Sequence, residues 1–223
     1  MDTEELCSFL CQELPRTHLD RLLGAVESAF HISNQHLTER FDKVPRSGPG
    51  PQSHHYHLQE ALLNIPPGEG FSVTNQATRP AGGHYALVNA GALKLTASVI
   101  TMDRAPAVRD ARFRRDLRQL NERLQQQHPD LFNSPVPPFG PQEDSLHALL
   151  LPYTAKWSEA DHSKPLACII AIPHSDNSRH YHLRKDVSEL WKYYEEGGGV
   201  TDIAYPKLRD KMRAAETGGN APG

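Results

Sequence analysis

The sequence has few cysteines and no long apolar run. Its three cysteines are an odd number, which excludes a framework in which every cysteine is paired in a disulfide. No stretch approaches the roughly 20 apolar residues of a membrane-spanning helix. The chain begins Met-Asp-Thr-Glu-Glu-Leu and lacks the basic start and apolar run of a secretory signal. We therefore expect no membrane segment and a reducing compartment, most simply the cytoplasm.

Several standard functional motifs are also missing. The sequence contains no Walker-type glycine-rich loop, no Gly-x-Gly-x-x-Gly after a predicted strand, no Gly-x-Ser-x-Gly and no Cys-x-x-Cys. The run Gly197-Gly198-Gly199 follows a predicted helix and is interpreted as its end. These absences move the commonest nucleotide-using and hydrolase classes out of first place. They leave any cofactor unknown and the question of enzyme activity open.

The charge is close to balanced, and histidine is abundant. The formal net charge of −3 argues against nucleic-acid binding through overall positive charge, although a local basic face is still allowed. The 13 histidines make the net charge sensitive to pH just below neutrality. One hypothesis is therefore an accessory subunit whose histidines respond to pH.

Hydrophobic periodicity predicts an α+β fold in which N-terminal helices precede a mostly antiparallel sheet with helices packed against it. The apolar spacing repeats every three to four residues in the helical segments and alternates along 92–101, whereas 146–153 and 166–172 are short apolar runs flanked by breakers, typical of central strands. The turn Asn89-Ala90-Gly91 joins two strands as a hairpin, with Gly91 in a left-handed conformation. The expected helices are 3–13, a longer one from Thr17, a short piece at 58–64, 107–127 and 186–195. The expected strands are 84–88, 92–101, 146–153 and 166–172. The main elements thus follow an α-α-β-β-α-β-β-α order.

Composition divides the chain into four parts. Residues 1–45 are a helical N-terminal segment, and residues 46–53, rich in proline and glycine, read as a linker or loop. Residues 54–212 form the α+β core. Residues 213–223 are expected to be a disordered tail.

A tetrapeptide occurs twice, as His55-Tyr56-His57-Leu58 and as His180-Tyr181-His182-Leu183. In an extended segment the two histidines of each copy point to the same face. Two imidazole pairs that met in space would offer a metal four nitrogen ligands: His55, His57, His180 and His182. The alternative, which we favour, is a set of surface or hydrogen-bonded histidines, because no standard metal-binding spacing is present.

The segment 173–182 follows the best candidate for a buried strand, a common position for functional groups. In an enzyme, His174 is a candidate general acid or base, Asp176 its orienting partner and Arg179 an anion clamp, with His180 beside them. This is the hydrolase or nuclease hypothesis, with or without a metal. The alternative is a polar turn whose Ser, Asp and Asn side chains cap the local backbone, and we favour it.

Arginines gather on the 107–127 helix. Arg112, Arg115 and Arg118 fall on one flank at 100° per residue. That flank is either a phosphate-contacting face or a solvated face balanced by neighbouring carboxylates, and the absence of interleaved aromatic residues favours the second. The leading hypothesis is an intracellular macromolecule-binding or regulatory protein acting through its amphipathic helices and this arginine-rich helix. A protein partner is expected, and nucleic acid is the alternative through 109–123.

Overall fold

The computed structural model describes residues 1–41, 46–78, 82–102, 108, 110–125, 145–157, 161–176 and 179–196, without the side chain of Arg123. The predicted tail at 213–223 and the predicted helix end at 197–199 lie outside these residues. Within them, no helix combines the length and the apolar character needed to cross a membrane.

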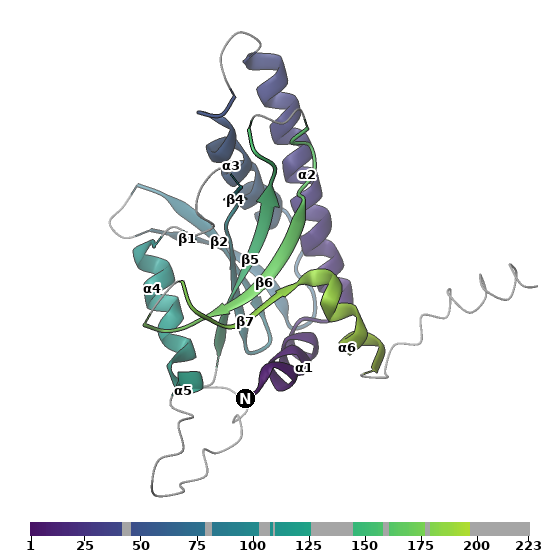
Figure 1. Ribbon diagram of the computed structural model, residues 1–223, viewed down its shortest axis with the longest axis vertical. Coiled ribbons are helices and arrows are strands. Elements are labelled where there is room, and N and C mark those ends of the chain that lie inside the picture. Colours follow the sequence, from purple (N-terminus) through teal and green to yellow (C-terminus); the bar gives the residue numbers. More distant parts are fainter. Residues whose placement is uncertain are drawn as a thin grey trace, which may run out of the picture.

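A seven-stranded sheet forms the centre of the molecule (Figure 1). The strand order is β1-β2-β3-β5-β6-β7, with the short β4 also paired to β5. Only β3 and β4 run parallel to β5, and the other pairs are antiparallel. The predicted α+β fold with a mostly antiparallel sheet is therefore confirmed. The strands are β1 Phe71–Ala77, β2 His84–Ala90, β3 Leu93–Ala97, β4 Ile100–Thr101, β5 Leu146–Thr154, β6 Ala167–Pro173 and β7 Tyr181–Asp186.

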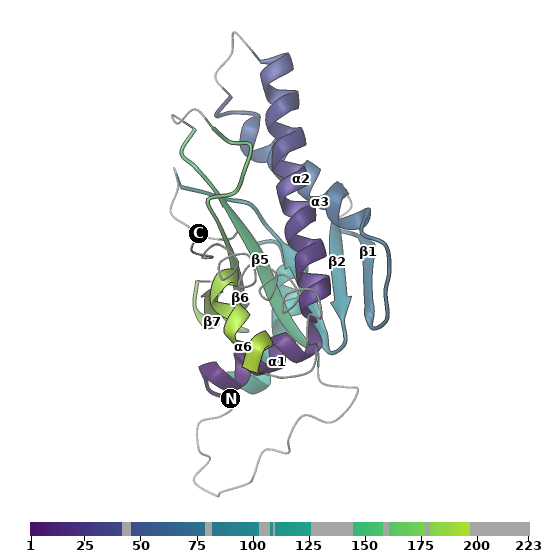
Figure 2. The same ribbon diagram turned by 90° about the vertical axis from the view of Figure 1, so that its right-hand side faces the viewer.

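The N-terminal helices cover one face of this sheet. The long helix α2 runs along almost the whole molecule (Figures 1 and 2). Its residues Leu22, Val26 and Phe30 share one buried core with Leu95 of β3 and Leu150 of β5. Helices α1 and α2 of the predicted N-terminal segment are thus packed on the sheet. The helices of this face are α1 Thr3–Glu13, α2 Arg16–Arg40, α3 Gly50–Leu63 and, after a 3-10 turn at Val187–Leu190, α6 Trp191–Glu196.

The other face of the sheet carries a different layer. All nine residues of β5 are buried, because alternate side chains point to opposite faces and both faces are covered. Leu150 belongs to the large core, whereas Leu149 and Leu151 belong to a second, smaller one. On that second face lie α4 Arg112–Arg118, a 3-10 turn at Gln119–Asn121 and α5 Glu122–Gln125.

Local differences from the sequence prediction have clear causes. Residues 50–53, expected in a linker, form the first turn of α3, where Pro51 fits because the first turn needs no backbone donor. The hairpin turn is Gly91-Ala92, so Asn89 and Ala90 remain in β2; Gly91 has φ 52° as predicted. The edge strands β1 and β7 were not predicted, because their sequences are rich in polar residues.

Candidate functional site

The candidate site begins where β5 and β6 separate. Their antiparallel ladder pairs Leu149 with Ala171, and the same register would bring His147 opposite Pro173 two residues further on. Proline has no backbone N–H to donate to a ladder. The side chain of Asn121 occupies this place instead: its Nδ2 donates to the carbonyl oxygens of His147 (3.0 Å) and Pro173 (2.8 Å), and its Oδ1 accepts from the His147 N–H (2.8 Å). Asn121 therefore fastens the α4–α5 segment to the sheet.

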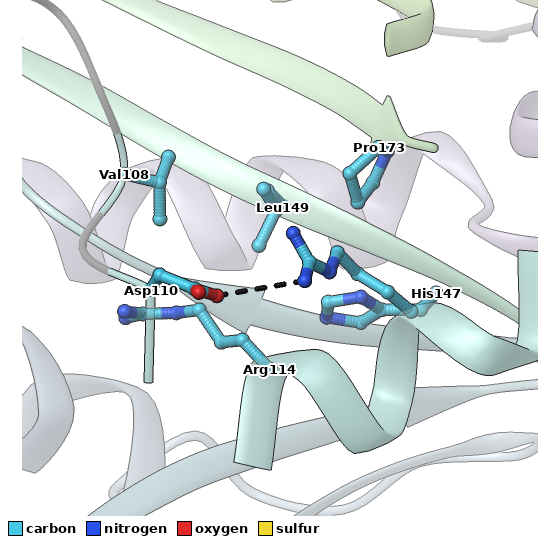
Figure 3. Close-up of a pocket in the computed structure, with 7 residues that line it drawn as sticks. Val108, Asp110, Arg114, His147, Leu149 and Pro173 are labelled. Atoms are coloured by element: carbon cyan, nitrogen blue, oxygen red, sulfur yellow. Dashed lines mark ion pairs between the residues drawn. The ribbon is translucent and has the colours of Figure 1, made fainter. Parts of the chain in front are cut away.

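Next to these hydrogen bonds, between α4 and the sheet, lies a small cavity (Figure 3). Its volume is about 10 Å³, roughly that of one water molecule. Two arginines from α4 reach into it, and both are buried, with 6% of Arg114 and 5% of Arg118 exposed. The remaining lining residues are Val108, Asp110, His147, Leu149 and Pro173.

Charged side chains from α4 and from the residue Asp110 line this cavity. Asp110 Oδ1 lies 3.5 Å from Arg118 Nη2, and its Oδ2 lies 4.0 Å from Arg115 Nη1. The Arg114 guanidinium donates to the carbonyl oxygen of Ala97 at 3.3 Å. Among the described residues, Asp110 is the one carboxylate that lines the cavity, and its side chain is 48% exposed. Arg118 is thus a buried cation paired with a partly solvated carboxylate.

His147 is held neutral at the floor of the cavity. Burial, and then the nearby charges of Arg114 and Arg118, lower its pKa to about 3. Its Nε2 lies 3.0 Å from Thr96 Oγ1. Its Nδ1 is buried and has no hydrogen-bond partner within the described part of the chain.

The described residues between β6 and β7 are 174–176 and 179–180, and residues 174–176 contact this layer. Gln125 on α5 donates to Asp176 Oδ1 (2.8 Å), lies 3.3 Å from His174 Nδ1 and accepts from the Ser175 hydroxyl. Gln119 donates to the Ser175 carbonyl oxygen. The structure therefore brings together two segments that the sequence analysis treated separately, the arginine-rich helix and the histidine turn.

The predicted catalytic residues meet in part. His174 Nδ1 lies 4.0 Å from Asp176 Oδ1, and the rings of His174 and His180 have centroids 6.0 Å apart. The ring of His182 stacks on His174 at 3.9 Å; burial and this neighbour lower the pKa of His182 to about 4. Arg179 is exposed in the same turn. The four residues share one turn, and their catalytic role remains a prediction.

The predicted metal ligands do not converge. His55 and His57 lie on α3, where side chains two residues apart point to nearly opposite sides, and His57 contacts His36 of α2 instead. His180 and His182 lie on the β7 side, and α3 packs near β1 and β2, at the other end of the sheet. Among the described residues, no group of three or more His, Cys, Asp or Glu side chains is arranged to hold a metal.

The three arginines of the predicted flank differ in their exposure to solvent. Arg112 and Arg115 are exposed, whereas Arg118 is buried against the cavity. Phe113 of α4 is partly buried and stacks at 3.9 Å on Tyr85 of β2. Arg109 lies outside the described residues. An aromatic pair, made by Phe113 of α4 and Tyr85 of β2, therefore lies beside the arginines. The sequence of the helix alone does not show this pair.

Comparison with known proteins finds no match among protein families, curated sequences or solved structures. The function of this chain therefore rests on the chemistry of its own residues. The residues that sequence reasoning missed are Tyr85, Arg114, Asn121 and His147. Only Arg114 carried a usable signal in the sequence. It lies on the helix face opposite Arg112, where an amphipathic helix normally has apolar residues.

Proposed function

We propose that this protein binds a partner protein through a surface made by α4 and the adjoining Tyr85 of β2. It is here called the α4 ridge and consists of Tyr85, Arg112, Phe113, Arg115 and Asp116. The observation that carries the proposal is the partly exposed Tyr85–Phe113 stack beside two exposed arginines. Tyrosine and arginine are enriched among the residues that contribute most of the binding energy in protein interfaces. The aromatic rings would supply apolar contact, and the arginines would pair with carboxylates of the partner.

The polar anchors beneath the ridge support this proposal. Asn121 fastens the segment to β5 and β6, and Arg114 donates to the Ala97 carbonyl oxygen of β3. Binding by a surface that is already fixed loses little conformational entropy. A short helix of seven residues, α4, would be marginal by itself, so the anchors are what make its exposed side chains a usable interface.

The charge pattern favours a protein over nucleic acid. Exposed carboxylates stand among the arginines, at Asp116 and Glu122 on the helical segment and at Asp176 on the adjoining turn. A nucleic-acid backbone presents a continuous row of negative charges and would place some of them against these carboxylates. A protein surface can oppose each arginine with an acid and each carboxylate with a base.

A charge-reversal pair tests the proposal. The variant Arg112→Glu/Arg115→Glu changes the ridge, and Arg21→Glu/Arg40→Glu makes the same charge change at exposed positions of α2. Each purified chain is immobilised, and proteins retained from nuclease-treated extract are quantified by mass spectrometry. We expect a partner whose retention falls at least about tenfold with the ridge variant only, since each interfacial arginine contributes about 1–2 kcal/mol.

Two results would count against the ridge. Retention that falls equally with both variants would show a general charge effect, and retention that survives both would place the interface elsewhere. Retention that is seen with untreated extract and lost after nuclease treatment would transfer the function to nucleic acid.

A second candidate function, a hydrolase or nuclease, is supported by the convergence of His174, His180 and His182 beside Asp176. An imidazole near a carboxylate is a common general acid or base. The test is hydrolysis of bis(p-nitrophenyl) phosphate, with and without Mg²⁺ or Mn²⁺, by the wild type, by His174→Asn and by the control His31→Asn. A rate that His174→Asn does not reduce would end this proposal.

A further inference from the structure

We propose that β1 pairs edge to edge with β1 of a second copy of this chain, so that two sheets join into one across a two-fold axis. β1 is an outer strand of the sheet and lies at the margin of the molecule (Figure 2). An outer strand presents a row of backbone donors and acceptors to a further strand. This edge shares no residue with the α4 ridge, so either proposal can fail without the other.

The alternation of the β1–β2 ladder decides which backbone groups of β1 face outward. Just beyond one end of β1, the Thr78 N–H donates to the Gly83 carbonyl oxygen at 2.8 Å. Just beyond the other end, the Gly91 N–H donates to the Gly70 carbonyl oxygen at 3.0 Å. In an antiparallel pair every second residue bonds the neighbouring strand, so the even-numbered residues of β1 face β2. The odd-numbered residues therefore turn their N–H and C=O groups to the outer edge.

Four residues of β1 thus face the outer edge, and one of them is already paired. Phe71 exchanges backbone hydrogen bonds of 2.9 and 3.1 Å with Gly68, in the turn that precedes the strand. This exchange confirms that the odd-numbered residues face outward. Within the described part of the chain, the outward backbone groups of Val73, Asn75 and Ala77 have no hydrogen-bond partner. The open part of the edge is therefore 73–77.

The two edges of the sheet differ in the features that normally prevent pairing with another chain. At the opposite edge, β7 carries Arg184, Lys185 and Asp186, and its register against β6 shifts at Ile172–Pro173. β1 has the sequence Phe-Ser-Val-Thr-Asn-Gln-Ala, without a charge or a proline, and its register against β2 is unbroken. Proteins commonly protect exposed edges with charges, prolines or bulges, so β1 is the edge that is open to a partner.

The side chains of β1 suit a second copy of the same strand. Antiparallel pairing centred on Asn75 places this residue opposite its own copy and places Val73 opposite Ala77, which pairs every outward N–H and C=O of the three residues. The Asn75 amide is both a donor and an acceptor and can face its like, whereas two like charges directly opposite would repel. Because β1 has no charge, it fits its own copy better than a charged segment of another protein.

The symmetry of this pairing fixes the shape and the strength of the dimer. The two-fold axis is perpendicular to the sheet, so equivalent faces of the two copies adjoin. The α2 and α3 helices of both copies would lie on one face of the joined sheet, and both α4 helices on the other. A single short strand pair is a small interface, and small interfaces bind weakly. We therefore expect a dissociation constant of about 0.1 mM.

The experiment measures the association of the full chain by analytical ultracentrifugation, from about 10 μM to about 1 mM. Asn75→Lys and Asn75→Asp each place like charges opposite one another at the centre of the pairing, and an equimolar mixture of the two places opposite charges there. Gln35→Lys and Gln35→Asp are the matched controls, because Gln35 is an exposed amide side chain on α2. Asn75 is also exposed, and melting temperatures show that each variant folds.

The expected result is a wild-type dimer whose fraction rises with concentration. Asn75→Lys alone and Asn75→Asp alone should each weaken association by about threefold or more, because like charges directly opposite are destabilising. Their mixture should associate at least as tightly as the wild type. The Gln35 variants, alone and mixed, should match the wild type.

Three results would overturn the proposal. A wild type that stays monomeric up to about 1 mM would show that the edge does not pair with its copy. A dimer that neither Asn75 variant weakens would place the interface elsewhere. Weakening by both variants without recovery in their mixture would show that Asn75 does not meet its own copy.

Discussion

Replacing Asn121 by alanine should cost more stability than its single short side chain suggests. Asn121 is fully buried and makes three hydrogen bonds, two to carbonyl oxygens on β5 and β6 and one from the His147 N–H. It stands where Pro173 cannot continue the ladder between these strands. The substitution therefore removes the connection of the α4–α5 segment to both strands at once.

The magnitude follows from the three bonds. A buried hydrogen bond contributes about 1 kcal/mol net, and a backbone group left without a partner costs about 1–3 kcal/mol. Asn121→Ala should thus lower the free energy of unfolding by about 3 kcal/mol, a large part of the roughly 5–15 kcal/mol that folded domains have. The control Gln119→Ala removes one 3.4 Å bond to Ser175 at an exposed position and should change it by no more than about 0.5 kcal/mol.

Urea denaturation followed by circular dichroism measures both variants. The midpoint of unfolding should fall for Asn121→Ala with an unchanged slope, because the slope reports the surface exposed on unfolding. A loss below about 1 kcal/mol would refute the reasoning, since it would mean that water or a shifted strand replaces all three bonds. A loss equal to that of Gln119→Ala would refute it as well.

Three further predictions concern titration, reactivity and backbone conformation. The pKa of His182 is lowered from 6.5 to about 4, so between these values the unfolded chain binds a proton that the folded chain does not. The free energy of unfolding should therefore fall as the pH drops from about 6.5 towards 4, less steeply in His182→Gln than in the control His31→Gln, as urea midpoints will show. Burial raises the pKa of all three thiols, to about 11 for Cys11 and about 12 for Cys168. Ellman's reagent at a pH of about 8 should therefore label the native protein much more slowly than the unfolded chain. Fast labelling of the native protein would contradict this burial. Gly91→Ala should destabilise by about 1–2 kcal/mol because Gly91 is left-handed and a β-carbon there would meet the Glu13 carboxylate. Gly24→Ala, in open space on α2, should instead stabilise by about 0.5–1 kcal/mol, and thermal melting distinguishes the two.

Elements whose burial follows a simple period could be predicted from the sequence. Helix α1 was predicted with the observed bounds, and the apolar runs of β5 and β6 were recognised within a residue or two. The edge strand β7 was missed because only Leu183 of its six residues is buried. The His55–His57 segment was interpreted as extended, although it is helical, because a proline-rich start hid the first turn of α3.

The candidate site was harder to predict, because its buried residues are polar. Arg114 and Arg118 occupy the face of α4 that a helix normally fills with apolar side chains. Their burial is made favourable by acceptors from other elements, such as Asp110 and the Ala97 carbonyl oxygen, because a buried charge is costly unless it is paired. Asp110 is near these arginines in the sequence, but the Ala97 carbonyl oxygen is not, and the burial of the two guanidiniums depends on the sheet beneath them.

The sequence by itself determined the α+β class, the long N-terminal helices, the hairpin at Gly91 and the two buried central strands. These features depend on hydrophobic period and on local backbone preferences, which a single segment carries. The tertiary structure alone decided that the arginine helix and the histidine turn adjoin, that Tyr85 stacks on Phe113, and that Asn121 replaces a strand partner at Pro173. Such contacts join residues far apart in the chain, and their energies depend on distances and burial that arise only when the sheet has formed.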